Sequence, residues 1–291
     1  MGCVQSCCYG TLYFTQEFYQ SYIRGHKNVQ LFLAIVGGMI FMVILLAIFG
    51  AFRHHCEDPE IETYYSLMTL SWPQTLCKKT TAKQCEPTIP LNFTLHGLWP
   101  VLRGRKTQLI NCLKDGNEYI FSLDKLESIQ PQLQQEWPNI FLNSSNSNFW
   151  QHEWTKHGLC TDMTVQDYFE KSLKLKQKYP IYKWLNDGKI KPNNSKAYTE
   201  KEFQDVLNKH DLSPDYYVMT CVEVSNDYNV IKQRWLDEIR LCAQFHDPMN
   251  DNGNLVKCDK DSMYAFDNKS FCNNTEGFYF VEYYKDGDFN I

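Results

Sequence analysis

An uncharged, apolar segment from Val29 to Phe52 constrains the fold of this chain more than any other feature of its sequence. In a helix its 24 residues rise about 1.5 Å each, which is enough to cross the roughly 30 Å hydrocarbon layer of a bilayer. We therefore expect a transmembrane helix or signal anchor at residues 29–52. The alternative is a signal peptide cleaved near Ala51, although the apolar region of a signal peptide is usually shorter.

The charges beside this segment set its expected orientation. Arg24 and Lys27 precede it, whereas only Arg53 follows it closely, and basic residues favour the cytoplasmic side of a membrane. Residues 1–28 would then be a cytoplasmic tail, and residues 53–291 would lie in the lumen or outside the cell. This is the topology of a single-pass type II membrane protein, whereas cleavage would release a secreted or lysosomal protein.

Two further features favour an oxidising compartment for residues 53–291. Nine of the 12 cysteines lie there, which is typical of proteins that form disulfides outside the cytosol. All five Asn-x-Ser/Thr sequons lie there as well. Asn92 opens an expected buried strand, where a glycan is disfavoured. We expect glycans on the remaining four, which are Asn143, Asn193, Asn268 and Asn273.

The first residues match the pattern for N-myristoylation at Gly2, with Cys3, Cys7 and Cys8 available for palmitoylation. We interpret this match as accidental, because a transmembrane helix already anchors the chain and makes a lipid redundant.

The composition excludes several classes of protein. Hydrophobic residues make up 43% of the chain and charged residues 22%, which excludes a disordered chain or a coiled coil. A net charge of −5 disfavours a protein that holds nucleic acid on a broad basic face. The region after the apolar segment has no internal repeat and no convincing linker, so we expect one domain at residues 53–291.

Hydrophobic periodicity predicts a mixture of strands and helices that do not strictly alternate, which indicates an α+β domain. Pro131 lies inside the first expected helix and weakens that prediction. We expect helices at Leu123–Trp137, Ser147–Gly158, Thr164–Tyr179 and Thr199–Lys209, and strands at Tyr64–Trp72, Asn92–Trp99, Tyr216–Val224, Val230–Cys242 and Phe278–Tyr284.

The helix expected at Ser147–Gly158 carries an unusual group of ionisable side chains. On a helical wheel His152, Glu153, Lys156 and His157 fall within an arc of about 140°. A solvated polar face is the ordinary interpretation of a charged helix. A zinc-protease motif needs its second histidine four residues after the first, and Lys156 holds that position. Its ammonium would repel a dication, so we expect no metal here.

Two histidines and a lysine suit the cleavage of a phosphodiester beside a 2′-hydroxyl group. One imidazole can remove the hydroxyl proton and another can protonate the leaving 5′-oxygen, while a cation stabilises the transition state. A second wall of such a site is available at Phe93–Pro100, where Gly97 leaves room beside His96. Taken alone, a histidine in a strand is more often a core residue than a catalytic one.

The two segments together, FTLHGLWP at 93–100 and HEWTKHGLC at 152–160, resemble the two signature segments of the ribonuclease T2 family. The resemblance implies an antiparallel central sheet flanked by helices and a metal-independent endoribonuclease without a cofactor. Its substrate would be single-stranded RNA, cleaved through a 2′,3′-cyclic phosphate. Arg103–Lys106, in the loop after the first segment, matches no specificity loop that we recognise.

The resemblance also implies a role for each matching residue. His157 resembles the general base, His96 the general acid, and His152 the residue that binds the phosphate. The remaining implied site residues are Glu153 and Lys156, which stabilise the pentacoordinate phosphate, and Trp99, which stacks on a base.

The family pattern further implies four disulfides, whereas eight cysteines taken alone allow 105 pairings. Cys56 is left over, either as a free thiol or for an intermolecular disulfide, and we otherwise expect a monomer. The implied pairs are Cys77–Cys85, Cys112–Cys160, Cys221–Cys272 and Cys242–Cys258.

One alternative function stays open at this point. The chain could be a secreted or surface glycoprotein that acts mainly by binding or signalling, with ribonuclease activity secondary. The complete set of matching residues in the two signature segments argues against an inactive scaffold but does not exclude a second role.

Overall fold

A sheet of eight strands organises the part of the chain that the computed structural model describes. The described residues are 64–79, 85–104, 109–225, 232–245, 253–259, 270–272 and 277–282, together with Gly38 and Phe41. The chain divides into two units, Met1–Ile61 and Glu62–Ile291. In the first unit, Gly38 and Phe41 are both helical.

The expected membrane segment falls almost wholly outside the described residues. Residues 1–63, apart from Gly38 and Phe41, lie outside the described residues. They include the expected tail, Gly2 and the cysteines at 3, 7, 8 and 56. Within the described ranges, no helix combines the length and the apolar character that a membrane crossing requires.

The sheet confirms the expected α+β class. Its main path runs in the order β2, β1, β5, β4, β7, and all of these neighbours pair antiparallel. Among the described pairings, the contact of β8 with β5 is parallel. The strands are β1 (Tyr64–Ser71), β2 (Thr94–Leu102), β3 (Ala197–Tyr198), β4 (Tyr217–Ser225), β5 (Lys232–Gln244), β6 (Asn254–Leu255), β7 (Ser270–Phe271) and β8 (Phe278–Tyr279).

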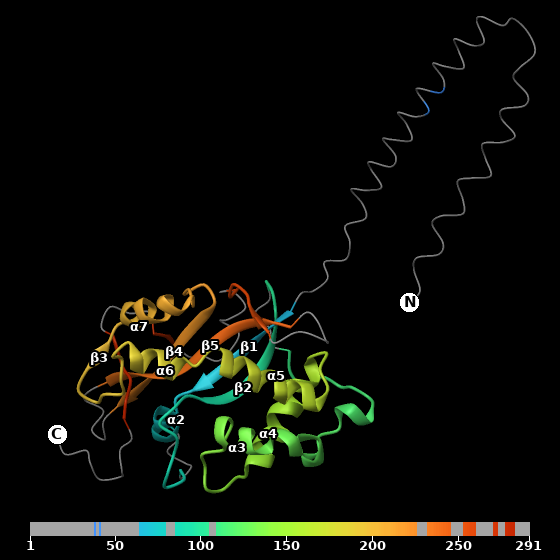
Figure 1. The fold of residues 1–291 in the computed structure, drawn as a ribbon, viewed down its shortest axis with the longest axis horizontal. Coiled ribbons are helices and arrows are strands. Elements are labelled where there is room, and N and C mark those ends of the chain that lie inside the picture. The colour runs from blue at the N-terminus through green and yellow to red at the C-terminus, as the bar shows by residue number, and fades with distance from the viewer. Residues whose placement is uncertain are drawn as a thin grey trace, which may run out of the picture. The chain divides into compact units, whose positions relative to one another are not determined.

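Helices pack against this sheet, and Figure 1 shows α5 and α6 running across it. Ser145, Thr164 and Thr199 begin three of the helices, each accepting a hydrogen bond from the backbone N–H three residues on. The helices are α2 (Pro73–Lys79), η1 (Asn117–Tyr119), η2 (Leu123–Ile129), α3 (Gln130–Glu136), α4 (Asn146–Lys156), η3 (Gly158–Cys160), α5 (Val165–Lys178), α6 (Ile181–Asp187), α7 (Glu200–Leu207) and η4 (Asn208–His210).

Two elements near the site differ from their expected bounds, and each contains a proline. The helix expected at Leu123–Trp137 is a 3₁₀ helix, η2, followed by α3, which has Pro131 in its first turn, where no N–H is needed. The strand expected to end at Trp99 continues through Pro100 to Leu102. Proline is tolerated there because β2 lies at the end of the main path of strands and pairs with β1 alone among the described strands.

Other expected strands shift by a few residues. β5 runs from Lys232 to Gln244, and the expected start at Val230 lies outside the described residues. The late strand expected at Phe278–Tyr284 stops at Tyr279, and residues 283–284 are again outside the described ranges.

Both faces of the sheet are covered by apolar side chains. The larger core gathers Leu70, Leu98, Ile239 and Leu241 from the strands with buried tryptophans from the helical side, including Trp154. A smaller cluster on the opposite face holds Tyr65, Leu67, Trp99, Val101 and Cys242. The apolar residues of β1, β2 and β5 are therefore buried on both sides of the sheet.

The described residues contain four disulfides, and they are the four pairs that the family resemblance implies. They join Cys77 to Cys85, Cys112 to Cys160, Cys221 to Cys272 and Cys242 to Cys258.

Candidate active site

An irregularity in the pairing of β1 with β2 places the His96 side chain. Thr69 lies opposite Gly97 and Leu70 lies opposite Leu95, so the register skips His96. Such a bulge changes the direction of the side chain it carries. It also lets Leu95 and Leu98, three positions apart, enter the same core. His96 itself is partly exposed, with 29% of its side chain accessible.

Glu153 is the buried centre of the site. Its Oε2 accepts a hydrogen bond of 2.9 Å from the Trp99 indole N–H, and its Oε1 lies 3.9 Å from His96 Nε2. Gly97 makes this approach possible, because a Cβ atom at this position would collide with Trp99 Nε1 and Glu153 Oε2. The backbone of β2 and the side chain of α4 therefore meet at a position that only glycine fits.

Burial governs the charge of Glu153. Loss of solvent raises the pKa of this carboxyl above its ordinary value, and the nearby positive groups and the Trp99 hydrogen bond oppose the rise. Of the charged neighbours, His96 opposes it most strongly, followed by His152 and Lys156.

His157 lies just beyond the helix on which we expected it. α4 ends at Lys156, and His157 caps it with φ −121° while its N–H bonds to the Glu153 carbonyl. The imidazole is 3% exposed, and its ring centroid is 5.2 Å from that of Trp99. Burial, reinforced by Lys156 and the other histidines, lowers the pKa of His157 to about 3. Its Nδ1 has no hydrogen-bond partner among the described residues.

The other two expected residues of α4 are more accessible. His152 is exposed and Lys156 is half-buried. His152 lines a groove of about 480 Å³ together with His96, Glu153 and the half-buried Phe149. The centroids of the His96 and Phe149 rings are 6.0 Å apart.

The structure thus brings all six expected site residues into one region, with different exposure. His96, His152 and Glu153 border the groove, whereas Trp99 is 5% exposed and has His157 beside its ring. Phe149 borders the groove too, although the sequence analysis did not select it. Its position three residues before His152 on the same helix was the available signal.

Glu238 and Arg240 on β5 were also missed. The Glu238 carboxylate lies 2.9 Å from His96 Nδ1, and the Arg240 guanidinium bonds to the same carboxylate. The available signal was the placement of Asp237, Glu238 and Arg240 within the otherwise apolar stretch Trp235–Ala243 of the strand. A buried charge needs a partner, so charged residues among the apolar positions of a strand indicate an ion pair or a hydrogen bond.

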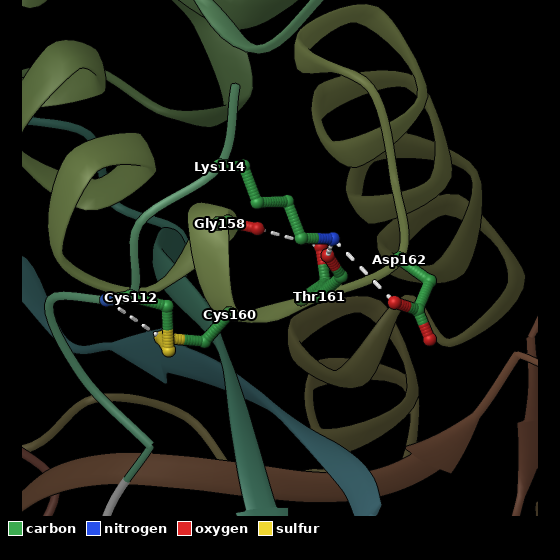
Figure 2. The surroundings of a disulfide bond; sticks show 6 residues. All are labelled: Cys112, Lys114, Gly158, Cys160, Thr161 and Asp162. Carbon is green, nitrogen blue, oxygen red and sulfur yellow. Dashed lines mark hydrogen bonds and ion pairs between the residues drawn. A yellow bond between two sulfur atoms is a disulfide. The ribbon is translucent and has the colours of Figure 1, made fainter. Parts of the chain in front are cut away.

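The Cys112–Cys160 disulfide holds the segment that follows the end of α4. Cys160 follows α4 within η3, and the backbone N–H of Asn111 donates to the Lys156 carbonyl. Figure 2 shows Lys114 reaching over the same turn, where its ammonium bonds to the Thr161 carbonyl and lies 3.4 Å from the Asp162 carboxylate. The Thr161 hydroxyl donates to the Gly158 carbonyl at 2.7 Å. These contacts hold the segment that follows His157.

The described sequons are on the surface. Asn143 and Asn193 are exposed. Asn92 is exposed as well, because β2 begins at Thr94, so burial does not oppose a glycan there. Asn268 and Asn273 lie outside the described residues, as do residues 105–108 of the loop that follows β2.

Comparison with known proteins identifies relatives over most of residues 62–291. The model of the Ribonuclease T2 family matches residues 63–258. Ribonuclease Oy of Magallana gigas is 28% identical over 74% of this chain and 95% of its own length. Ribonuclease T2 of Danio rerio is 28% identical over 78% of this chain and 86% of its own. Ribonuclease MC of Momordica charantia is 36% identical over 42% of this chain, and the match covers 62% of that protein.

Solved structures agree with the fold. The self-incompatibility associated SF11-RNase of Nicotiana alata superposes with a TM-score of 0.53 and 26% identity, covering 75% of this chain and 98% of its own. Ribonuclease MC1 from bitter gourd seeds gives a TM-score of 0.52 and 26% identity, covering 62% of this chain and 88% of its own. A mutant of ribonuclease MC1 with the same scores was solved in complex with 5′-UMP.

Proposed function

Because the chain belongs to the ribonuclease T2 family and is therefore an endoribonuclease, we propose that it cleaves single-stranded RNA by transphosphorylation. The product of the first step is a 2′,3′-cyclic phosphate, and the reaction uses neither a metal nor another cofactor. His157 acts as the general base and His96 as the general acid.

The observation that carries this proposal is that the His96 and His157 rings lie 5.0 and 5.2 Å from the ring of Trp99, whose indole N–H bonds to the Glu153 carboxylate. Glu153 bonds to Trp99, lies 3.9 Å from His96 Nε2, and accepts the His157 N–H at its backbone carbonyl. Acid–base cleavage beside a 2′-hydroxyl needs two groups that exchange protons on either side of a developing negative charge. The site supplies both groups within a few residues of α4 and β2.

The reaction then proceeds in two stages. His157 takes the proton of the 2′-hydroxyl, the 2′-oxygen bonds to phosphorus, and the bond from phosphorus to the 5′-oxygen breaks as His96 protonates that oxygen. In the second stage His96 takes a proton from water, the water oxygen bonds to phosphorus, and the bond to the 2′-oxygen breaks as His157 returns its proton. His152 binds the phosphate, while Glu153 and Lys156 stabilise the pentacoordinate state.

The electrostatics of the site support the role of His157. A general base must be neutral before it accepts a proton, and the lowered pKa of His157 keeps its imidazole neutral down to acidic pH. Lys156 contributes to that lowered pKa and also carries the positive charge that the phosphorane oxygens need.

The groove supports a single-stranded substrate. Proteins recognise unpaired RNA by stacking its bases on aromatic side chains. We propose that one base stacks against Phe149, which lines the groove, and that Trp99, which is 5% exposed and outside the groove lining, is the second stacking residue. His96 and His152 border the same groove, so a base held there places its phosphate beside both.

We also propose how the chain is arranged around this domain. Residues 1–28 form a cytoplasmic tail, residues 29–52 a signal anchor, and residues 53–291 the lumenal or extracellular ribonuclease domain of a monomer. Four disulfides and the exposed sequons Asn143 and Asn193 support an oxidising compartment with access to glycosylation. Cleavage of the anchor would give a secreted or lysosomal form.

The test is cleavage of single-stranded RNA between pH 4 and pH 8 in the presence of EDTA. We expect activity that survives the chelator and fragments that end in a 2′,3′-cyclic phosphate. His96→Phe and His157→Phe should each be inactive while remaining folded. Absence of cleavage at every pH, or loss of cleavage on adding EDTA, would contradict the proposal. If the double variant retained a biological effect, a binding or signalling role would be favoured instead.

A further inference from the structure

A buried ion pair, Glu238 with Arg240, lies on β5, the second strand along the sheet from the one that carries His96. The side chains of Glu238 and Arg240 are 0% and 1% exposed. The Glu238 Oε2 accepts hydrogen bonds from Arg240 Nε at 3.0 Å and from Arg240 Nη2 at 2.6 Å. A buried ion pair needs this kind of full hydrogen bonding to offset the loss of solvent around both charges.

The second oxygen of Glu238 contacts the catalytic imidazole. Glu238 Oε1 lies 2.9 Å from His96 Nδ1, and the Ser71 hydroxyl donates to the same oxygen at 3.4 Å. An ionised carboxylate only accepts hydrogen bonds, so His96 Nδ1 must carry the hydrogen of this contact. The other ring nitrogen, Nε2, is then the atom that exchanges protons, and it is the nitrogen that lies 3.9 Å from Glu153.

We propose that Glu238 is a positioning residue for the general acid of this enzyme, an inference that rests on the proposed function. Its carboxylate fixes the orientation of the His96 ring and stabilises the doubly protonated imidazolium. From that form Nε2 gives its proton to the 5′-oxygen as the electron pair of the breaking phosphorus–oxygen bond moves onto that oxygen. His96 is left neutral, with its Nδ1 hydrogen still bound to Glu238.

Arg240 bonds to the Glu238 oxygen that does not contact His96. Its guanidinium balances the buried negative charge and also lies 5.3 Å from the centre of the Trp99 ring. Trp99 in turn donates to Glu153. β5 is therefore linked to α4 through side chains that surround His96 on two sides.

The charges that face His96 come from two elements. Glu238, with Arg240 behind it, approaches from β5, and Glu153 approaches from α4. His152 on the same helix shares the groove with His96, and His157 and Lys156 lie at the end of that helix. Removing the charge of Glu238 while the α4 groups stay in place should destabilise the imidazolium, so that activity falls at a lower pH.

A purely structural role for Glu238 makes a different prediction, and Asp237 offers a matched control. The Asp237 side chain is also 0% exposed, lies on the same strand and pairs with Lys79 at 2.6 Å. Glu238→Gln and Asp237→Asn each remove one buried charge from β5. Both should lower thermal stability, but only Glu238→Gln should change the chemistry of His96.

The experiment compares two substrates that differ in their leaving group. A dinucleoside phosphate releases a 5′-alkoxide that needs a proton, whereas a nucleoside 3′-(4-nitrophenyl phosphate) with the same base releases a nitrophenolate that does not. For Glu238→Gln we expect kcat to fall about 10- to 100-fold on the dinucleoside phosphate, within the scale of general acid catalysis, and about threefold or less on the nitrophenyl ester. The alkaline limb of its pH profile should move to lower pH, and Asp237→Asn should match the wild type on both counts.

An equal loss on both substrates, or an unchanged pH profile, would overturn the proposal. Should Glu238→Gln fail to fold, ¹⁵N NMR of the wild-type protein decides, with the His96 signal identified by its absence from His96→Gln. We expect the neutral ring to carry its hydrogen on Nδ1, and a hydrogen on Nε2 would overturn the inference. This readout needs no activity, so it remains informative even if the wild-type protein fails to cleave RNA and the proposed function is wrong.

Discussion

At the scale of single residues, the site depends on ionisable groups whose pKa values burial has shifted away from their ordinary values. Desolvation lowers the pKa of His157 to about 3 and raises that of Glu153. These two shifts change the stability of the fold in opposite directions as the pH falls. The neutral imidazole is stable in the folded protein at acidic pH, whereas the same group in the unfolded chain takes up a proton.

His157 should therefore make the protein less stable in acid. Its unfolded pKa is 6.5 and its folded pKa about 3, so the stability is present above pH 6.5 and is lost as the pH falls towards 3. Each pH unit in this window costs about 1.4 kcal/mol, or about 3 kcal/mol between pH 6.5 and pH 4. Urea unfolding of His157→Gln should show that much less acid destabilisation than the wild type. His152→Gln, at an exposed position, controls for the substitution itself. An equal loss of unfolding free energy in acid for the wild type and His157→Gln would contradict the lowered pKa of His157.

Gly97 gives a second prediction at this scale. Its replacement by alanine would push Trp99 Nε1 away from Glu153 Oε2, because the new methyl group would occupy their contact. We expect Gly97→Ala to lose about 1–3 kcal/mol of stability through overpacking. Displacement of the carboxylate should also lower kcat by about 10²-fold. Chemical denaturation and steady-state kinetics measure the two effects, and a wild-type kcat would show that the Trp99–Glu153 contact is dispensable.

At the scale of elements, the end of α4 is held by a covalent bond that closes a long loop. Cys112 and Cys160 are 48 residues apart, whereas Cys77 and Cys85 are 8 apart. A longer closed loop removes more entropy from the unfolded chain. The two disulfides should therefore differ in their contributions to stability and also in their effects on the site, because only the first adjoins His157.

Replacing both cysteines of a pair by serine tests this difference. The chain-entropy relation gives a loss of about 4 kcal/mol for the Cys112/Cys160 pair and about 2.5 kcal/mol for the Cys77/Cys85 pair. Guanidinium unfolding measures both. We expect kcat to fall in the Cys112/Cys160 variant alone, since its disulfide fixes the turn after His157. A larger loss of stability from the short loop would contradict the prediction.

The elements also show how far the sequence could predict this structure. Helices that bury a periodic apolar face, such as α5, and strands such as β1 were expected within about two residues of their ends, the usual uncertainty of such boundaries. α2 and α6 were missed because each has seven residues. Helices this short are stabilised by packing and not by their own sequence.

The site residues on β2 and α4 were predictable from the sequence, whereas the contact of Glu238 with His96 was not. Within each signature segment the residues lie close in sequence, so the two motifs themselves brought His96, Glu153 and His157 to attention. Glu238 reaches His96 only because β1 pairs with β2 on one side and with β5 on the other, with a bulge at His96. Pairing between distant strands and the position of a bulge are tertiary properties that local periodicity does not encode.

At the scale of the whole molecule, the arrangement of the chain across a membrane can be tested directly. If residues 29–52 are a signal anchor, protease added to sealed microsomes should remove the 1–28 tail and spare residues 53–291. N-glycosidase should increase the mobility of the spared domain, since Asn143 and Asn193 are exposed. N-terminal sequencing that starts near Ala51 would identify a cleaved signal peptide. Digestion of the domain in sealed vesicles would contradict the proposed orientation.

The position of β1 restricts which insertions and deletions enzymes with this fold can accept in evolution. β1 separates the strand of His96 from the strand of Glu238, and its own contact with the carboxylate is the Ser71 hydroxyl. Gaining or losing one residue within β1 would turn every following side chain of that strand to the opposite face. Surface loops can tolerate such changes in length. We therefore expect descendants of this gene to vary in the size of their loops while the number of residues between Thr69 and Ser71 stays fixed.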